Sequence, residues 1–204
     1  MNSFLTQIRI AIVATILFAV VCSGIYPVVI WGFSQLLFPY QANGSIVKSS
    51  DNKTRIGSSL LAQGFSGAKY FHPRPSATTE PDPKDATKTI PVPYAADNSS
   101  GSNLGPTQKD LIERVKGDAA TLAKENPGTP IPVDLVTTSA SGLDPDITPA
   151  GAMFQVPRVA NARGLPVDQV RALVEAHVQG RTLGVLGEPV VNVLELNLAL
   201  DALK

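Results

Sequence analysis

Residues 10–31 read IAIVATILFAVVCSGIYPVVIW, a run of 22 uncharged and mostly apolar residues. As an α-helix this run is about 33 Å long, and the hydrocarbon core of a bilayer is about 30 Å thick. A helix also satisfies its own backbone hydrogen bonds in lipid, where Gly24 and Pro27 are tolerated. The sequence therefore predicts a transmembrane helix that begins at Ile10 and ends at Gly32.

A cleaved signal peptide is the alternative interpretation of the same run. Arg9 would form its basic region, and residues 21–23 (VCS) would form its cleavage site. The residues before Cys22 lack the small side chain expected of a lipoprotein cysteine. Apolar character also continues well beyond Cys22, farther than a leader peptide requires, so a retained anchor is favoured.

The charges beside the run predict its orientation. Arg9 precedes it, and no lysine or arginine follows until Lys48. Because positive charge near a span favours the cytoplasmic side, residues 1–9 are expected to form a cytoplasmic tail. Residues 33–204 are then expected to form a soluble extracytoplasmic domain.

Composition limits the remaining functions. The chain has 17 basic and 17 acidic residues and no net charge, which argues against nucleic acid as a partner. Its single cysteine, Cys22, lies inside the apolar run, so an intrachain disulfide or a cysteine zinc cluster is excluded. The domain must therefore fold on its hydrophobic core alone.

The first half of the predicted domain shows strand and loop signals. Segments 45–47 and 55–62 flank Asp51-Asn52 and predict a β-hairpin. Residues 73–106 are rich in Pro, Ser, Thr, Asp and Asn, which predicts a long polar surface loop. A further strand is expected over 133–138.

The second half shows helix signals. A helix is expected after Gly105-Pro106-Thr107, with an apolar stripe that runs to residue 123 and Thr107 in a capping box with Asp110. Two more are expected over 149–162, capped by Thr148, and over 166–178. The last segment alternates as a strand does but also fits a helix capped by Asn192, and helix is favoured. The fold class is a mixed α/β domain, helical in its second half.

The residues for catalysis or metal binding are sparse. His177 lies on or near the apolar face of a predicted helix and is expected to be a satisfied core or boundary histidine, while His72 has no neighbouring ligand for a metal. Asp144 and Asp146 precede a helix cap and lack the rest of a calcium loop, so a turn is expected. No catalytic residue and no metal site are predicted.

Two anion-binding hypotheses are open. Residues 100–106 precede a helix, but they lack the Gly-Lys-Ser/Thr of a P-loop, so a loop that leads into the helix is favoured. Gln155, Arg158 and Arg163 form a polar group on or near the second predicted helix. A solvated face is the default interpretation for them. The alternatives are an interface or an anion site, and the three residues are the candidate nucleotide contacts.

Several short strings together resemble one family. Their order behind a single membrane span is similar to that of the C subunit of the bacterial Kdp potassium-transporting ATPase, over essentially the whole chain. The strings are FPYQANGS at 38–45, YFHPRPSA at 70–77, GSNLGP at 101–106, SASGLDP at 139–145, VPRVA at 156–160, LGEP at 186–189 and VNVL at 191–194.

The resemblance implies a non-catalytic subunit of an ATP-driven potassium importer in the bacterial inner membrane. Its implied partners are a channel-like potassium-binding subunit, a P-type ATPase subunit and a small single-helix subunit. It also implies a catalytic chaperone that raises the ATP affinity of the ATPase subunit. No cofactor is expected on this chain itself, and any role of ATP is expected to come through the ATPase partner.

Topology and direct ATP contact conflict, because an extracytoplasmic domain does not reach cytoplasmic ATP. We favour the topology, which makes the ATP effect an indirect coupling between distant sites. The alternative function is a membrane-tethered extracytoplasmic enzyme. Its candidate residues are Ser139, Ser141, Asp144 and His177.

Overall fold

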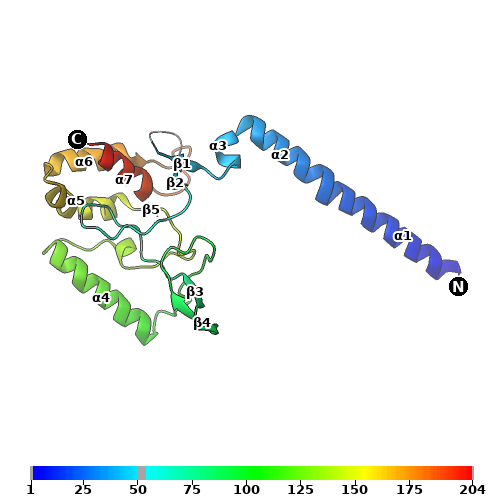
Figure 1. The fold of residues 1–204 in the computed structure, drawn as a ribbon, viewed down its shortest axis with the longest axis horizontal. Coiled ribbons are helices and arrows are strands. Elements are labelled where there is room, and N and C mark those ends of the chain that lie inside the picture. Colours follow the sequence, from blue (N-terminus) through cyan, green and yellow to red (C-terminus); the bar gives the residue numbers. More distant parts are fainter. Residues whose placement is uncertain (1, 50–53, 204) are drawn as a thin grey trace. The chain divides into compact units, whose positions relative to one another are not determined.

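The computed structural model describes residues 2–49 and 54–203. The chain divides into two compact units, Met1–Ser58 and Ser59–Lys204, and each is described by itself. Figure 1 shows a long helix in the first unit and a mixture of helices and short strands in the second. The predicted apolar N-terminal helix and mixed α/β remainder are both confirmed.

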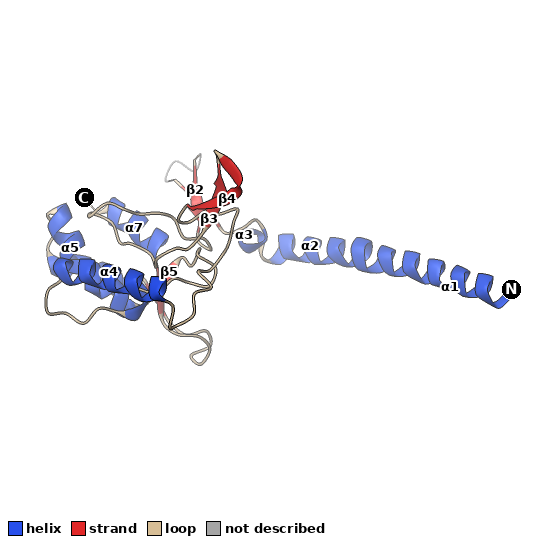
Figure 2. Ribbon diagram, turned by 90° about the horizontal axis from the view of Figure 1, so that it is seen from below, coloured by secondary structure: helices blue, strands red, loops and turns tan. Residues whose placement is uncertain are grey.

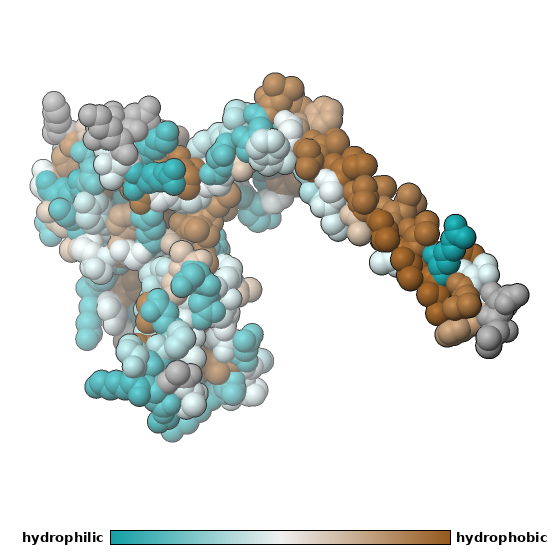
Figure 3. All heavy atoms as spheres, turned by 45° about the vertical axis from the view of Figure 1, so that its right-hand side comes forward, coloured by the Kyte–Doolittle hydropathy of each residue, from teal (hydrophilic) through white to brown (hydrophobic). Residues whose placement is uncertain are grey.

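The N-terminal helix is longer than the predicted span. It continues from Ser3 to Leu37, 35 residues that include an 18-residue stretch with a mean hydropathy of 2.4, and is long and apolar enough to cross a membrane. Figure 3 shows apolar surface along most of it. Its parts are α1 (Asn2–Phe18), a π-helical segment (Ala19–Ile25) and α2 (Tyr26–Leu37).

Proline explains the π-helical segment. Pro27 has no N–H, and its ring crowds the carbonyl four residues earlier, which belongs to Ser23. The helix widens before the proline, and Tyr26 N–H donates to Val21 O five residues back. The wider turn therefore relieves the clash without breaking the helix.

A short hairpin completes the first unit. After α3 (Pro39–Ala42), strands β1 (Ile46–Lys48) and β2 (Arg55–Ser58) pair in antiparallel fashion. This confirms the predicted hairpin, although β2 is shorter than expected. Its predicted turn at Asp51-Asn52 lies outside the described residues.

The second unit surrounds a small antiparallel sheet with strand order β5-β7-β6. Helices α5 and α7 pack with it, α6 packs against both of these helices, and a separate β3–β4 pair precedes α4. Figure 2 shows the β3–β4 pair in red and α4, α5 and α7 in blue. The elements in chain order are β3 (Thr79–Asp82), β4 (Asp85–Pro91), α4 (Lys109–Glu125), a 3-10 turn (Val133–Leu135), β5 (Asp146–Ile147), α5 (Pro149–Arg163), α6 (Val167–Ala176), β6 (Val178–Gln179), β7 (Val190–Asn192) and α7 (Val193–Ala202).

Two expected segments differ in the structure. Segment 73–106 contains the β3–β4 pair, which backbone pairing and the Asp82 turn hold without an apolar pattern. The prediction of a strand over 133–138 is wrong, because Val133–Leu135 forms a 3-10 turn. Its Asp134 is buried and accepts from Thr148 N at 2.8 Å, which an extended strand does not provide.

Helix caps follow the sequence in two of three cases. The Thr148 side chain accepts from Gly151 N, and the Asn192 side chain accepts from Glu195 N at 3.1 Å. The expected Thr107 cap is wrong: α4 starts after Gln108, which makes no side-chain cap. The C-terminal segment is a helix, as favoured, since Leu196 and Leu200 are both fully buried.

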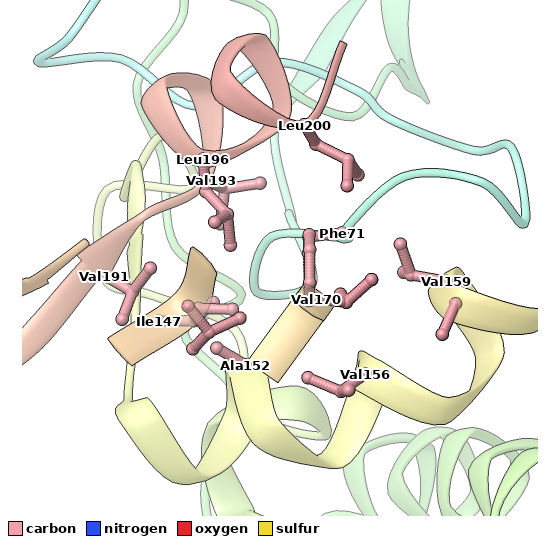
Figure 4. Packing of buried hydrophobic residues seen from close by; sticks show 12 residues of the cluster. Phe71, Ile147, Ala152, Val156, Val159, Val170, Val191, Val193, Leu196 and Leu200 are labelled. Atoms are coloured by element: carbon pink, nitrogen blue, oxygen red, sulfur yellow. The ribbon is translucent and has the colours of Figure 1, made fainter. Parts of the chain in front are cut away.

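The hydrophobic core lies where α5, α6 and α7 meet the sheet. Figure 4 shows Phe71 among side chains of all three helices, including Val159, Val170 and Leu200. Phe71 is fully buried although it comes from an irregular segment. Burying a phenylalanine side chain contributes about 1.5–3 kcal/mol, so the core stabilises that segment as well as the helices.

Candidate functional site: a clamped segment and its groove

Residues 68–72 form neither a helix nor a strand. Their backbone carbonyls therefore need hydrogen-bond donors from other parts of the chain. Each of the five carbonyl oxygens accepts a hydrogen bond from a side chain of α5 or α7. We call Gln155, Arg158, Arg163 and Asn197 the clamp. The bonds are Arg158 Nη1 to Ala68 O (2.7 Å) and Tyr70 O (3.0 Å), Arg163 Nε to Lys69 O (2.8 Å), Asn197 Nδ2 to Phe71 O (2.9 Å) and Gln155 Nε2 to His72 O (3.1 Å).

Two amide side chains of the clamp act as a neighbouring strand would. Asn197 Oδ1 accepts from Phe71 N at 2.9 Å, and Gln155 Oε1 accepts from His72 N at 2.8 Å. Each amide thus meets both the N–H and the C=O of one residue. Gln155 is 2% exposed and Asn197 1%, so these bonds satisfy groups that water does not reach.

The two arginines of the clamp are also ion-paired. Arg158 Nε lies 3.1 Å from Glu125 Oε2 of α4, and Arg163 Nη2 lies 2.6 Å from Asp201 Oδ1 of α7. Burial lowers the pKa of Arg158 from its usual value, while Glu125 opposes that shift. Arg163 also lies over the Tyr70 ring, 5.0 Å from its centroid.

These contacts show what the three candidate nucleotide contacts bind in the structure. Gln155, Arg158 and Arg163 lie on α5, as the sequence indicated, and each of them binds segment 68–72. The geometry therefore gives them a structural task. Sequence analysis missed Asn197, the fourth member, whose only signal was a single amide within the apolar string LELNLAL.

A groove with a volume of about 700 Å³ lies between the clamped segment and α4. His72, Arg114, Glu125 and Gln155 are among its lining residues, so cationic and anionic groups share it. Arg114 Nη1 donates to Asp118 at 2.8 Å and to Val136 O at 3.2 Å, which ties α4 to the segment after it. The charged side chains of the groove are paired with each other or with neighbouring residues, as in Arg114 with Asp118 and Glu125 with Arg158. Such a surface suits a protein contact better than a charged ligand.

His72 is one of the titratable groups that line this groove. Its Nε2 lies 3.1 Å from Gly67 O, and its backbone is held by Gln155. Burial and then the nearby Arg158 charge lower the pKa of His72 below the usual 6.5. The imidazole is therefore neutral at physiological pH.

The residues suggested for an enzyme are not brought together. Ser139 Oγ lies 3.4 Å from Ser141 Oγ, and Asp144 pairs with Arg74 at 2.9 Å. His177 ends α6, where its Nδ1 lies 2.8 Å from Leu173 O. Within the described part of the chain, no hydrogen bond or ion pair joins His177 to either serine or to Asp144.

The other candidate sites have local structural explanations. Asp144 Oδ1 accepts from Asp146 N at 3.1 Å, which forms the turn before β5. In residues 100–106, Gly105 N donates to Gln108 Oε1 at 2.9 Å, so that amide is engaged. Over residues 2–49 and 54–203, no cluster of three His, Cys, Asp or Glu side chains is suitable for a metal ion.

Fold and site together define a class of protein. The described part of the chain has a helix suited to span a membrane, followed by a domain of mixed helices and strands. The candidate binding side chains of that domain form hydrogen bonds with its own backbone. The family model for KdpC, the c chain of K+-transporting ATPases, matches residues 8–202. This chain belongs to that family. The helix fits a single-pass membrane subunit of a transporter.

Named relatives agree over nearly the full length. Each of the following is a potassium-transporting ATPase KdpC subunit. The Methylorubrum populi protein is 58% identical over 199 residues, 98% of each chain. That of Methylobacterium nodulans is 61% identical over 178 residues, 87% of this chain and 88% of the relative. That of Rhodopseudomonas palustris is 55% identical over 198 residues, 97% of this chain and 98% of the relative.

Proposed function

We propose that this chain is a non-catalytic accessory and assembly subunit of an ATP-driven, high-affinity potassium importer. It stands in the bacterial inner membrane with residues 1–9 in the cytoplasm and the soluble domain outside. The observation that supports this most directly is the clamp, which commits the best polar candidates to intramolecular bonds. The family match over residues 8–202 supports the transporter assignment.

The proposed partners are a channel-like potassium-binding subunit, a P-type ATPase subunit and a small single-helix subunit. The N-terminal helix packs against these membrane subunits. Gly24 in this helix supports this role, because small residues allow close helix packing in lipid. The outer domain then lies near the ion entrance.

The proposed effect on ATP is indirect. With the domain outside, the chain raises the ATP affinity of the ATPase subunit through the membrane subunits, as a coupling free energy between distant sites. Such a coupling is typically about 5–150-fold in affinity. ATP itself is bound by the ATPase partner.

Affinity purification of the tagged full chain in mild detergent tests the assembly role. We expect the three partner subunits to co-purify with the chain, and potassium uptake at micromolar potassium to fail when the gene is deleted. Recovery of the chain without a P-type ATPase subunit, or full uptake after deletion, would contradict the proposal.

A second measurement tests the ATP effect. The ATPase rate of the purified complex is measured against ATP concentration, with and without this chain. We expect KM for ATP to rise at least fivefold without it. A parallel calorimetric titration of ATP into the isolated full chain should give no binding heat at millimolar ATP; measurable binding would instead indicate direct contact through Gln155, Arg158 or Arg163.

A further inference from the structure

Side-chain hydrogen bonds join the end of the N-terminal helix to the segment that leads into the hairpin. Asn43 Nδ2 donates to Gln35 Oε1 of α2 at 3.0 Å and to Pro39 O at 2.6 Å, which fixes α3 against the end of α2. Tyr40 OH donates to Ser45 O at 3.1 Å. The hairpin is therefore held close to the point where the chain leaves the membrane helix.

Two cations face each other on this hairpin. Lys48 of β1 lies directly opposite Arg55 of β2, and both are exposed. Like charges in that arrangement destabilise a β-ladder. Neither side chain forms an ion pair with any residue in 2–49 or 54–203.

An irregular register creates this pairing. Val47 lies opposite Gly57, so a regular ladder would place Ile56 opposite Lys48. A bulge shifts the register by one residue and brings Arg55 there instead. Bulges bend a strand and re-aim its side chains, often beside a functional site. The bulge therefore places the two cations opposite each other.

The two cations border a hollow of the right chemistry for an anion. Its volume is about 600 Å³, and Lys48 and Arg55 line it together with Pro39, Tyr40, Asn43 and Ile46. Lysine supplies a point charge, and the arginine fork matches the oxygens of a phosphate. The Tyr40 ring and Ile46 supply an apolar wall.

The position along the chain matches the headgroup layer of a membrane. Trp31, Phe33 and Tyr40 are all exposed near the end of the helix, and aromatic rings favour that interface. From Ser45 to Lys48 the strand advances about 10 Å. The polar layer on each side of a bilayer is about 5–7 Å deep, and charges act over about 8 Å in physiological salt.

We propose that Lys48 and Arg55 bind the phosphate of an anionic phospholipid headgroup at the membrane surface. The bound phosphate relieves the repulsion between the two cations and draws the hairpin onto the bilayer. Lipids whose headgroup also carries a cation bind less well, because that cation offsets the phosphate charge. The site lies entirely within the first unit and does not depend on the proposed transport role.

Lipid competition on the full chain tests this site. The detergent-purified chain is mixed with equal amounts of phosphatidylglycerol and phosphatidylcholine of identical acyl chains, and native mass spectrometry counts the lipids retained. We expect phosphatidylglycerol to be preferred. Each of Lys48→Gln and Arg55→Gln should reduce the preference about fivefold, as one cation near an anionic surface does.

Matched variants and salt complete the design. Lys116→Gln with Arg171→Gln removes two exposed cations from α4 and α6 and should leave the preference unchanged, while Lys48→Arg should retain it. Raising salt to 1 M should weaken the preference of the unmodified chain. No preference in the unmodified chain, or the same preference in the Lys48→Gln/Arg55→Gln chain, would overturn the proposal.

Free phosphate distinguishes the source of the ligand. Inorganic phosphate at 10 mM is added to the lipid mixture. If the lipid stays bound, the headgroup within its membrane is the ligand. If phosphate displaces it and binds the chain without lipid, in a manner lost with Lys48→Gln and Arg55→Gln, the site still binds phosphate but its ligand is soluble, and the lipid part of the proposal is overturned.

Discussion

The backbone of Phe71 shows how single residues hold this domain together. Its N–H and C=O are buried, and both bond to the side chain of Asn197. A buried polar group without a partner costs about 1–3 kcal/mol. Asn197 thus supports the position of Phe71 in the core as much as the apolar side chains do.

We expect Asn197→Ala to lower the free energy of unfolding by about 2–6 kcal/mol, because it strands two buried groups. Chemical denaturation of the full chain in mild detergent, followed by circular dichroism, measures this. Asn161→Ala removes an exposed amide from α5 and should change stability by less than about 0.5 kcal/mol. Equal effects of the two substitutions would rule out the clamp role of Asn197.

Two glycines give opposite predictions for the same substitution. Gly142 has φ +67°, and a β-carbon there would lie 2.6 Å from Thr78 Cγ2 and 2.7 Å from Ser100 O. A β-carbon at Gly117 in α4 would meet nothing within 4 Å. Gly142→Ala should destabilise by about 2 kcal/mol or more, and Gly117→Ala should stabilise by about 0.5–1 kcal/mol. Thermal unfolding of both full-length variants decides; a shift of the same sign in both would contradict the assigned geometry.

The pKa of His72 makes stability depend on pH. Because burial lowers this pKa in the folded state, the unfolded chain binds the proton first as pH falls below about 6.5. The contribution is therefore complete above that pH and is lost below it, by at most about 1.4 kcal/mol per pH unit. Burial raises the pKa of Asp146 above its usual 3.8, so the folded chain binds that proton first as pH falls. Protonation of Asp146 therefore adds stability, whereas protonation of His72 removes it, and the Asp146 effect lies at lower pH.

Denaturation at pH 7.5 and pH 5.5 measures this effect. The full chain should lose more stability between these values than the His72→Gln variant does. The difference between the two slopes isolates His72 from other groups. Identical slopes would show that His72 has its ordinary pKa in the folded protein.

At the scale of elements, α4 differs from the other long helices of its unit. Lys109–Glu125 contains no buried residue, whereas α5 contains seven. Its tertiary bonds are few and lie near polar groups, such as Arg114 to Val136 O and Glu125 to Arg158. An element with few buried contacts opens at low free energy.

Hydrogen exchange by mass spectrometry on the full chain should therefore show α4 amides exchanging at least tenfold faster than those of α5. Glu125→Gln weakens the ion pair with Arg158 and should speed exchange in α4 further without a change in α6. Lys109→Gln removes an exposed ion pair within α4 and serves as the control. Equal protection of α4 and α5 would contradict this prediction.

The elements that the sequence predicted well are those set by local chemistry. The caps at Thr148 and Asn192 depend on a hydrogen bond three residues ahead, and Gly164 ends α5 with φ +66°. The 3-10 turn at Val133–Leu135 was missed because Asp134 bonds to Thr148, 14 positions away. The β3–β4 pair was missed because its side chains carry no alternating apolar pattern.

At the scale of the whole molecule, topology decides which partners the domain reaches. The expected orientation rests on Arg9 before the helix and on the lack of basic residues before Lys48. We expect Asp97→Cys, in the soluble domain, to react with an impermeant thiol reagent in intact cells, in a chain whose Cys22 is replaced by alanine. Ser3→Cys, at the other end of the helix, should react only after permeabilisation. The reverse pattern would place the domain in the cytoplasm and would permit direct contact with ATP.

The sequence by itself determined the long apolar helix, most of the later helices and the family, since each follows from neighbouring residues or from short strings in order. Only the tertiary structure decided what Gln155, Arg158 and Arg163 do. Their bonds, and those of Asn197, join positions as far as 126 residues apart. No local pattern records such a pairing, because the clamped backbone offers the same N–H and C=O groups whatever its side chains are. The cations at Lys48 and Arg55 likewise meet only through a bulge that shifts the register of the hairpin.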